Sequence, residues 1–319
     1  MTNEGNSNRE PIDLAAIEEF WRRESAEMLE RNRALAAAHR GRAAELARRR
    51  ASCETIIAGC MDERTAFTKE ALGLLPGEAL VYASGGGKIE AAIFDRLFGP
   101  RLKEAAAAGK DSAVYFVTHK CADDPHKGCA AFANDVQAQV GYFTSLKRQL
   151  METYPRTRTH VLMLDTTAYG LEAVDIDEDD ARCARVLSAG GGLNDFRARE
   201  TGHAGHGIYI GDAYRAWVNE HNKYFRLSAM NPDIAGNVGI ALNVMGHHSC
   251  VDLATTPVVI HVDLPRYAER AASDAAAANI GSALERILDM PAVREKIEEG
   301  SLQIVRTETD AENWQGKLL

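Results

Sequence analysis

The residues best suited to chemistry are two cysteines and a histidine, two of them at the ends of predicted strands. Cys60 comes directly after the apolar stretch 55–59, and His119 comes directly after the β-branched and aromatic stretch 113–118. Cys129 lies further along, at the start of a predicted helix. Two thiolates and one imidazole would give a zinc ion three protein ligands and leave its fourth tetrahedral position open. This pattern is typical of a catalytic zinc, which generates hydroxide from water near neutral pH.

Two charged residues follow Cys60 closely in the chain. Asp62 is near enough to reach the same pocket, and Arg64 can grip its carboxylate through two parallel hydrogen bonds. A structural zinc site needs neither residue, so the pair Asp62 and Arg64 is predicted to be catalytic.

Other residues compete for the ligand positions. His126 and Cys129 have the spacing of a His-x-x-Cys pair, but His126 follows the turn-forming residues 123–125 rather than a strand. Cys121 could take the place of Cys129 as the second thiolate. We favour His119 and Cys129 and keep His126 and Cys121 as alternatives. His126 could also line the pocket or relay protons.

Three further motifs have simpler interpretations. The glycines 85–87 could cradle an anion, but a plain turn is favoured. His247 and Cys250 could bind a metal, but a structural role is favoured. The acidic run 175–180 is predicted to be a solvated loop, with cation binding as the alternative.

Strands alternate with helices from residue 53 onward, which predicts an α/β fold with a mostly parallel central sheet flanked by helices. The strands are expected at 55–59, 80–83, 113–118, 160–164, 207–212, 225–229, 257–263 and 302–306. The helices are expected at 88–97, at 130–153, from about 234, and at 266–287. In such sheets functional sites lie at the carboxyl ends of strands, where Cys60 and His119 both fall.

The second half of the chain repeats the order of elements in the first half. Sliding one half along the other by roughly 145–152 positions aligns Cys60 with Asp212 and His119 with Asp263. The second half would therefore have lost the metal ligands. We predict an N-terminal tail and helical arm, a zinc-binding catalytic α/β domain, and a second α/β domain that is a degenerate copy, at 1–52, 53–172 and 173–319 respectively.

The arm at residues 12–50 is predicted to form one long helix or two. Its segment 31–50 holds seven arginines and one glutamate. A solvated helical face is the simplest interpretation, and a docking surface for an acidic protein partner is the alternative.

Composition excludes several classes of protein. Lysine and arginine number 37 against 46 acidic residues, and a formal charge of −9 argues against nucleic acid as a partner. No stretch reaches the ~18 consecutive apolar residues of a membrane span. The first eleven residues lack the features of a signal peptide, so a cytoplasmic location is expected. Six cysteines are too few for a disulfide scaffold of this length.

The stretch 55–169 resembles the β-class carbonic anhydrases. Residues 60–64, Cys-Met-Asp-Glu-Arg, match the Cys-x-Asp-x-Arg motif of that family. Residues 79–92 resemble its strand and glycine-rich turn before a helix, and residues 113–120 resemble the strand that delivers its zinc-binding histidine. The resemblance covers roughly a third of the chain.

The interval between the histidine and the second cysteine departs from the common pattern of the family. A cysteine usually follows the histidine by three residues, but position 122 is alanine here. The longer interval from His119 to Cys129 is similar to the carboxysome-shell carbonic anhydrases and the cadmium-using diatom enzymes. Those relatives contain duplicated domains, in keeping with the internal repeat.

The resemblance implies a function. It implies that Cys60, His119 and Cys129 bind zinc and that Asp62 and Arg64 form the catalytic dyad. The expected reaction is the reversible hydration of CO2 to bicarbonate by zinc-bound hydroxide. A homo-oligomer is expected, and the carboxysome is the alternative location. The alternatives are a non-catalytic zinc-stabilised binding or assembly module, and a hydrolase of a CO2 analogue such as CS2 or COS.

Overall fold

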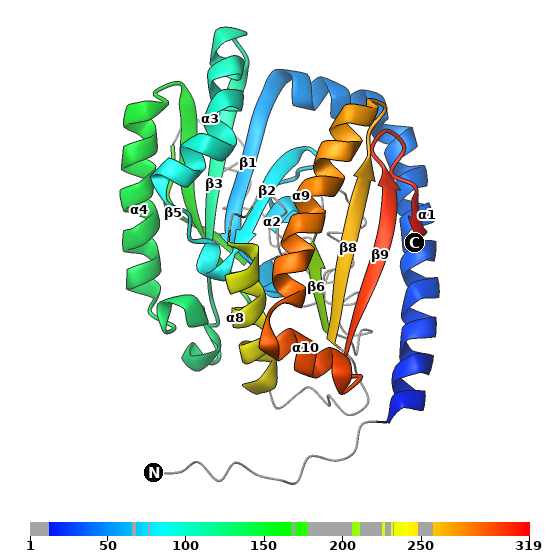
Figure 1. The fold of residues 1–319 in the computed structure, drawn as a ribbon. Helices are drawn as coiled ribbons and strands as arrows, with labels where there is room; N and C mark the ends of the chain where they lie inside the picture. The colour runs from blue at the N-terminus through cyan, green and yellow to red at the C-terminus, as the bar shows by residue number, and fades with distance from the viewer. Residues whose placement is uncertain are drawn as a thin grey trace.

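The computed structural model describes residues 13–65, 68–75, 77–167, 170–177, 206–210, 225–226, 231, 233–247 and 258–319. Within these residues, strands form two five-stranded sheets, and helices pack on both. Figure 1 shows one long helix, α1, along one side of the molecule, beside the strands of the second sheet.

The first sheet is mostly parallel. Its strands are β1 (Cys53–Cys60), β2 (Ala79–Ser84), β3 (Asp111–Lys120), β4 (Thr157–Asp165) and β5 (Gly170–Asp175). They lie in the order β2-β1-β3-β4-β5, and only β5 runs antiparallel to its neighbour. The helices α2 (Thr68–Ala71), α3 (Ala91–Ala107) and α4 (Val136–Thr153) accompany it. The predicted α/β class with a mostly parallel, helix-flanked sheet is confirmed.

Both faces of the first sheet are buried, which explains the uninterrupted apolar runs of its strands. Alternate residues point to opposite faces. Val114 and Phe116 pack with Phe94 and Phe143 under α3 and α4, whereas Tyr115 belongs to the buried cluster on the other face. This two-sided core holds the carboxyl ends of β1 and β3 in fixed register.

The second sheet has the same strand order as the first. Its strands are β6 (His206–Ile210), β7 (Phe225–Arg226), β8 (Val258–Arg266), β9 (Leu302–Asp310) and β10 (Gly316–Leu318). They lie in the order β7-β6-β8-β9-β10, with four parallel strands and an antiparallel β10. The helices α8 (Ile234–His247), α9 (Arg270–Leu288) and α10 (Pro291–Glu298) belong to this half. That this half is a degenerate copy of the first stays a prediction.

The long helix α1 (Leu14–Ser52) is tied to the C-terminal segment of the chain. Asp13 caps its first turn by accepting hydrogen bonds from the amides of Ala15 and Ala16. Asn32 donates to the carbonyl of Trp314 (2.7 Å) and accepts from the amide of Gly316 (2.7 Å). The arm is therefore a single docked helix.

Three predicted helices begin later than the sequence suggested, among them α9, which was expected from residue 266 and begins at Arg270. Residues 130–132 form a 3-10 turn, and the left-handed backbone of Ala133 and Asn134 separates this turn from α4. Asp135 then caps α4 by accepting from the amide of Ala138. α3 starts at Ala91, because the turn at residues 85–87 delays it.

The predicted solvated loop at 175–180 is described only in part. Asp175 is the last residue of β5, and its carboxylate pairs with Lys147 Nζ at 2.5 Å. Residues 178–180 lie outside the described residues.

His261 on β8 is a fully buried histidine held neutral by its surroundings. Its Nε2 lies 2.7 Å from Thr307 Oγ1, and that hydroxyl donates its hydrogen to Asp263 Oδ1 (2.9 Å). Nε2 must then be the protonated nitrogen that donates to Thr307. Burial lowers the pKa of His261 from 6.5 to about 3.

This depressed pKa makes folding stability depend on pH. His261 is protonated near pH 6.5 in the unfolded chain but only near pH 3 in the folded chain. The stabilisation is thus fully present above pH 6.5 and is lost as pH falls toward 3, by at most about 5 kcal/mol. We expect His261→Gln to flatten the pH dependence of the free energy of unfolding in urea between about pH 7 and 4.5. Met151→Gln, an exposed substitution that changes no titratable group, is the control and should leave the slope unchanged. Equal slopes for wild type and His261→Gln would refute the assignment.

Candidate metal centre

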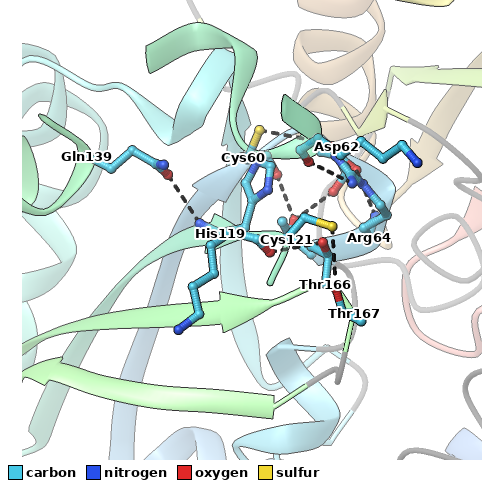
Figure 2. Close-up of polar contacts among 11 residues, drawn as sticks. Cys60, Asp62, Arg64, His119, Cys121, Gln139, Thr166 and Thr167 are labelled. Carbon is cyan, nitrogen blue, oxygen red and sulfur yellow. Dashed lines mark hydrogen bonds and ion pairs between the residues drawn. The ribbon is translucent and has the colours of Figure 1, made fainter. Parts of the chain in front are cut away.

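Two neighbouring strands and the loop after one of them bring three ligand-bearing side chains together. Cys60 is the last residue of β1, and His119 is the penultimate residue of β3, which pairs with β1 in parallel. Cys129 directly precedes the 3-10 turn at 130–132. The sulfur atoms and an imidazole nitrogen all lie within 4.8 Å of one another, and all three side chains are buried. Figure 2 shows Cys60 beside the ring of His119. No other such group of three occurs within the described residues.

The imidazole of His119 fits a metal ligand. Both of its ring nitrogens are buried and form no hydrogen bond with a nitrogen or oxygen atom of the described residues, and the polar group that interacts with the ring is the Cys60 thiol. Buried polar atoms without partners are rare, because each loses its hydration without compensation. Two thiols and an imidazole are also the donors that Zn²⁺ prefers in proteins. The Cys60, His119 and Cys129 group therefore fits a zinc ion.

The two thiols influence each other strongly. The adjacent Cys129, together with burial, raises the pKa of Cys60 well above its usual range. The pKa of Cys129 is lowered, because Cys60 acts as a hydrogen-bond donor to its sulfur. The pair by itself thus makes Cys129 the more readily ionised thiol and keeps the shared proton on Cys60. A divalent cation would let both ionise, since its charge offsets theirs.

Asp62 and Arg64 form the expected bidentate ion pair beside this group. Arg64 Nη2 lies 2.6 Å from Asp62 Oδ2, Arg64 Nε lies 3.0 Å from Oδ1, and the Arg64 amide also donates to Oδ1 at 3.0 Å. Burial alone would raise the pKa of Asp62, but the charge and hydrogen bonds of Arg64 outweigh it, so the pKa is lowered. Asp62 is therefore a carboxylate at neutral pH.

The pair is also tied to the cysteine-bearing segments. The amide of Asp62 donates to Cys60 Sγ at 3.5 Å. Arg64 Nη1 donates to the carbonyl of Lys127 at 3.0 Å, two residues before Cys129. Both residues retain some exposure, 19% for Asp62 and 30% for Arg64, so the pair lies at the border between the buried group and solvent.

The alternative ligands lie elsewhere. His126 is exposed on a 3-10 turn, where its amide donates to Asp124 Oδ1. Cys121 is partly exposed, and its sulfur lies 3.4 Å from Thr167 Oγ1 (Figure 2). The structure thus groups His119 and Cys129 with Cys60 and leaves His126 and Cys121 outside the group.

The described part of the second half contains no group of three side chains that could hold a metal ion. Asp263, aligned with His119, is fully buried and accepts hydrogen bonds from Thr307 and Thr309. Asp212, Cys250 and the side chain of His247 lie outside the described residues.

Sequence reasoning missed Gln139. Its Oε1 accepts a hydrogen bond from the amide of His119 at 3.3 Å and so steadies the end of β3. Gln139 is buried on α4 in line with Phe143, Leu146 and Leu150. A polar residue on an otherwise apolar helical stripe was the signal that could have revealed it.

The glycines 85–87 form a tight 3-10 turn against this site. Gly86 and Gly87 have φ of 68° and 71°, which L side chains rarely adopt. A Cβ on Gly87 would lie 2.8 Å from the backbone carbon of Gly59, next to Cys60. The interpretation as a turn is confirmed, and glycine is required there by both conformation and space.

Gly87→Ala should destabilise the fold strongly. Gly109 offers a matched control, because it has a φ of 68° but nothing within 4 Å of an added Cβ. We expect Gly109→Ala to cost about 1 kcal/mol and Gly87→Ala at least about 3 kcal/mol of unfolding free energy in denaturant titrations. Similar costs at the two positions would mean that the contact with Gly59 is unimportant.

Comparisons with known proteins give weak likenesses to solved structures alone. No family model and no curated protein matches the chain. Among solved structures, the crystal structure of the β-carbonic anhydrase CafA of the fungal pathogen Aspergillus fumigatus is similar, at 18% sequence identity. The match covers 51% of this chain and 97% of that chain, with a TM-score of 0.34. At this level the likeness assigns neither a family nor an activity.

None of the helices in the described part of the chain combines the length and the apolar character that a membrane crossing requires.

Proposed function

We propose that the chain is a zinc-dependent carbonic anhydrase of the β class, similar to its carboxysome-shell branch, that hydrates CO2 reversibly to bicarbonate. One observation carries the proposal. A buried Cys60, His119 and Cys129 group lies beside an ion-paired Asp62 and Arg64. The same residues carry the resemblance of the sequence to that family.

Each residue has a distinct role in the proposed reaction. Cys60, His119 and Cys129 would hold the zinc ion, which supplies Lewis-acid chemistry that activates water at neutral pH. Asp62 stays ionised because Arg64 lowers its pKa, so an Asp62 oxygen can accept a hydrogen bond from the attacking oxygen and orient it. Arg64 keeps that carboxylate in one orientation through its two-nitrogen grip.

The Asp62 and Arg64 pair favours catalysis over a purely structural zinc. A structural site is closed by its ligands and gains nothing from an oriented, partly exposed carboxylate next to it. The buried thiols explain metal binding in either case, so the pair is the feature that separates the two functions.

Stopped-flow measurement of CO2 hydration by the zinc-loaded chain tests the proposal. We expect saturable hydration that a chelator abolishes and that returned zinc restores. Stoichiometric zinc without hydration would favour the binding module. Turnover of CS2 or COS in place of CO2 would favour the hydrolase.

The proposal also covers the second half of the chain, its assembly and its location. Residues 173–319 are a degenerate copy without a catalytic metal, supported by the shared strand order of the two sheets. Whole chains assemble into a homo-oligomer. The protein works in the cytoplasm, with the carboxysome as an alternative location.

The arginine-rich stretch of α1 is proposed to dock an acidic protein. Residues 31–50 carry seven arginines and one glutamate in a chain of net charge −9. Arg33, Arg40, Arg42 and Arg48 are exposed on this stretch. Charge complementarity therefore favours an acidic partner, whose binding would weaken with salt.

A further inference from the structure

The helix α8 of the second half reaches the glycine turn next to the metal centre. Asn237 on α8 accepts a hydrogen bond from the amide of Gly85 at 2.5 Å and donates to the carbonyl of Asp233 at 2.8 Å. Asn231, which precedes α8, donates to the carbonyl of Ala83 at 3.2 Å. Both asparagines are buried, with 7% and 4% of their surface exposed. The buried side chains of two asparagines in the second half thus hold the end of β2 and the turn that follows it.

That turn contacts the segment that carries Cys60. The amide of Met61 donates to the carbonyl of Ser84 at 2.8 Å, and Ser84 is the register partner of Cys60 in the sheet. Gly87 lies against the backbone of Gly59. A shift of the turn would therefore be transmitted to both neighbours of Cys60.

The same turn contacts the segment that follows Cys129. Lys88 Nζ donates to the carbonyl of Ala131 at 2.6 Å. A Cβ on Gly86 would lie 2.9 Å from the side chain of Ala131 and 2.8 Å from that of Phe132. The turn is thus packed between the segments that carry the two thiols.

Apolar packing joins the second half to the same place. Met61 and Ala83 are buried in one cluster with Ile234, Val238 and Ile260, which belong to α8 and β8. Met61 separates Cys60 from Asp62 in the chain. The core of the second half therefore also covers the residue between a proposed ligand and the proposed catalytic carboxylate.

We infer that Asn237, supported by Asn231, is a positioning residue for the metal centre, and that through the turn at 85–88 it sets the separation of the Cys60 and Cys129 sulfurs. The inference rests on the proposed metal site but not on the hydration of CO2. Residues that orient metal ligands without touching the metal typically change affinity by 10–100-fold when they are removed.

The test compares Asn237→Ala with two other variants of the full-length chain. Asn237→Asp keeps an acceptor for the Gly85 amide and should therefore retain part of the wild-type metal binding. Asn32→Ala is the matched control, because Asn32 is also buried and joins two distant segments by one accepted and one donated backbone hydrogen bond, away from the metal centre. Thermal melts identify a temperature at which all three variants are folded.

The first readout is metal binding. We expect Asn237→Ala to weaken zinc affinity about tenfold and to shift the thiolate-to-cobalt absorption of the Co²⁺-substituted chain. Asn237→Asp should lie between Asn237→Ala and wild type, and Asn32→Ala should match wild type in both measurements. Unchanged affinity and spectrum in Asn237→Ala, or equal changes in Asn32→Ala, would overturn the inference. A chain that binds metal in this way yet does not hydrate CO2 would refute the proposed function alone.

The second readout needs no metal. In the metal-free chain, alkylation of each cysteine by iodoacetamide is followed by mass spectrometry. Cys60 and Cys129 are buried and should react slowly in wild type and about tenfold faster in Asn237→Ala. Cys53 is equally buried at the start of β1 and reports general loosening of the fold. Acceleration at Cys60 and Cys129 but not at Cys53 supports the inference, and uniform or absent acceleration contradicts it.

Discussion

Changing Cys129 to serine is expected to reduce the zinc content of the purified chain from about one ion per chain to a small fraction of that value. The hydroxyl of serine is a poor zinc ligand, and two remaining ligands, Cys60 and His119, cannot hold the ion against dilution. We expect a loss of affinity of at least about 100-fold, measured by elemental analysis and by competition with a chromogenic chelator.

Cys121→Ser is the matched control for that experiment. Cys121 follows His119 closely but lies outside the buried group, with its sulfur near Thr167 Oγ1. Its replacement should leave the zinc content unchanged. Retention of zinc in Cys129→Ser together with its loss in Cys121→Ser would transfer the ligand role to Cys121 and show that the described grouping is not the binding site.

Asp62→Asn is expected to lower CO2 hydration by at least about 100-fold while zinc stays bound. The amide has nearly the same shape as the carboxylate but carries no charge, and its NH2 group cannot accept the hydrogen bond that the carboxylate accepts. Since the pKa of Asp62 is lowered by Arg64, the wild-type group is ionised at any neutral pH. Stopped-flow rates at about pH 7 and 8.5, with zinc content measured on the same samples, check this.

Two further variants test whether a loss of CO2 hydration in Asp62→Asn is specific to the Asp62 and Arg64 pair. Asp175→Asn removes another carboxylate from an ion pair, with Lys147 at 2.5 Å, but on β5 and outside the metal group, so it should leave hydration unchanged. Arg64→Lys keeps a positive charge but loses the two-nitrogen grip and should fall below wild type. Wild-type hydration in Asp62→Asn would remove Asp62 from the mechanism.

The type of most elements could be predicted from the sequence, but several boundaries could not. β3 was expected at 113–118 and spans Asp111–Lys120, because its ends are set by pairing with β1 and β4. The start of α4 was missed because residues 130–133 include three alanines, which favour helix, whereas Ala133 and Asn134 adopt a left-handed backbone and Asp135 caps the helix. A residue pattern indicates which positions are buried and with what periodicity, but it indicates only weakly which strands and helices pack against each other.

The sequence by itself determined the alternation of strands and helices, the placement of Cys60 and His119 at strand ends, and the pairing of Asp62 with Arg64. These features depend on apolar periodicity and on residues two positions apart, and both are visible in a short stretch of sequence. Only the tertiary structure decided that His119 and Cys129, rather than His126 and Cys121, join Cys60. Contacts with Asp165 and Thr167 hold the start of the loop, residues 121–123, outside the group. Only the tertiary structure likewise placed Asn237 against Gly85, 152 positions away, since the packing between two sheets has no counterpart in local sequence.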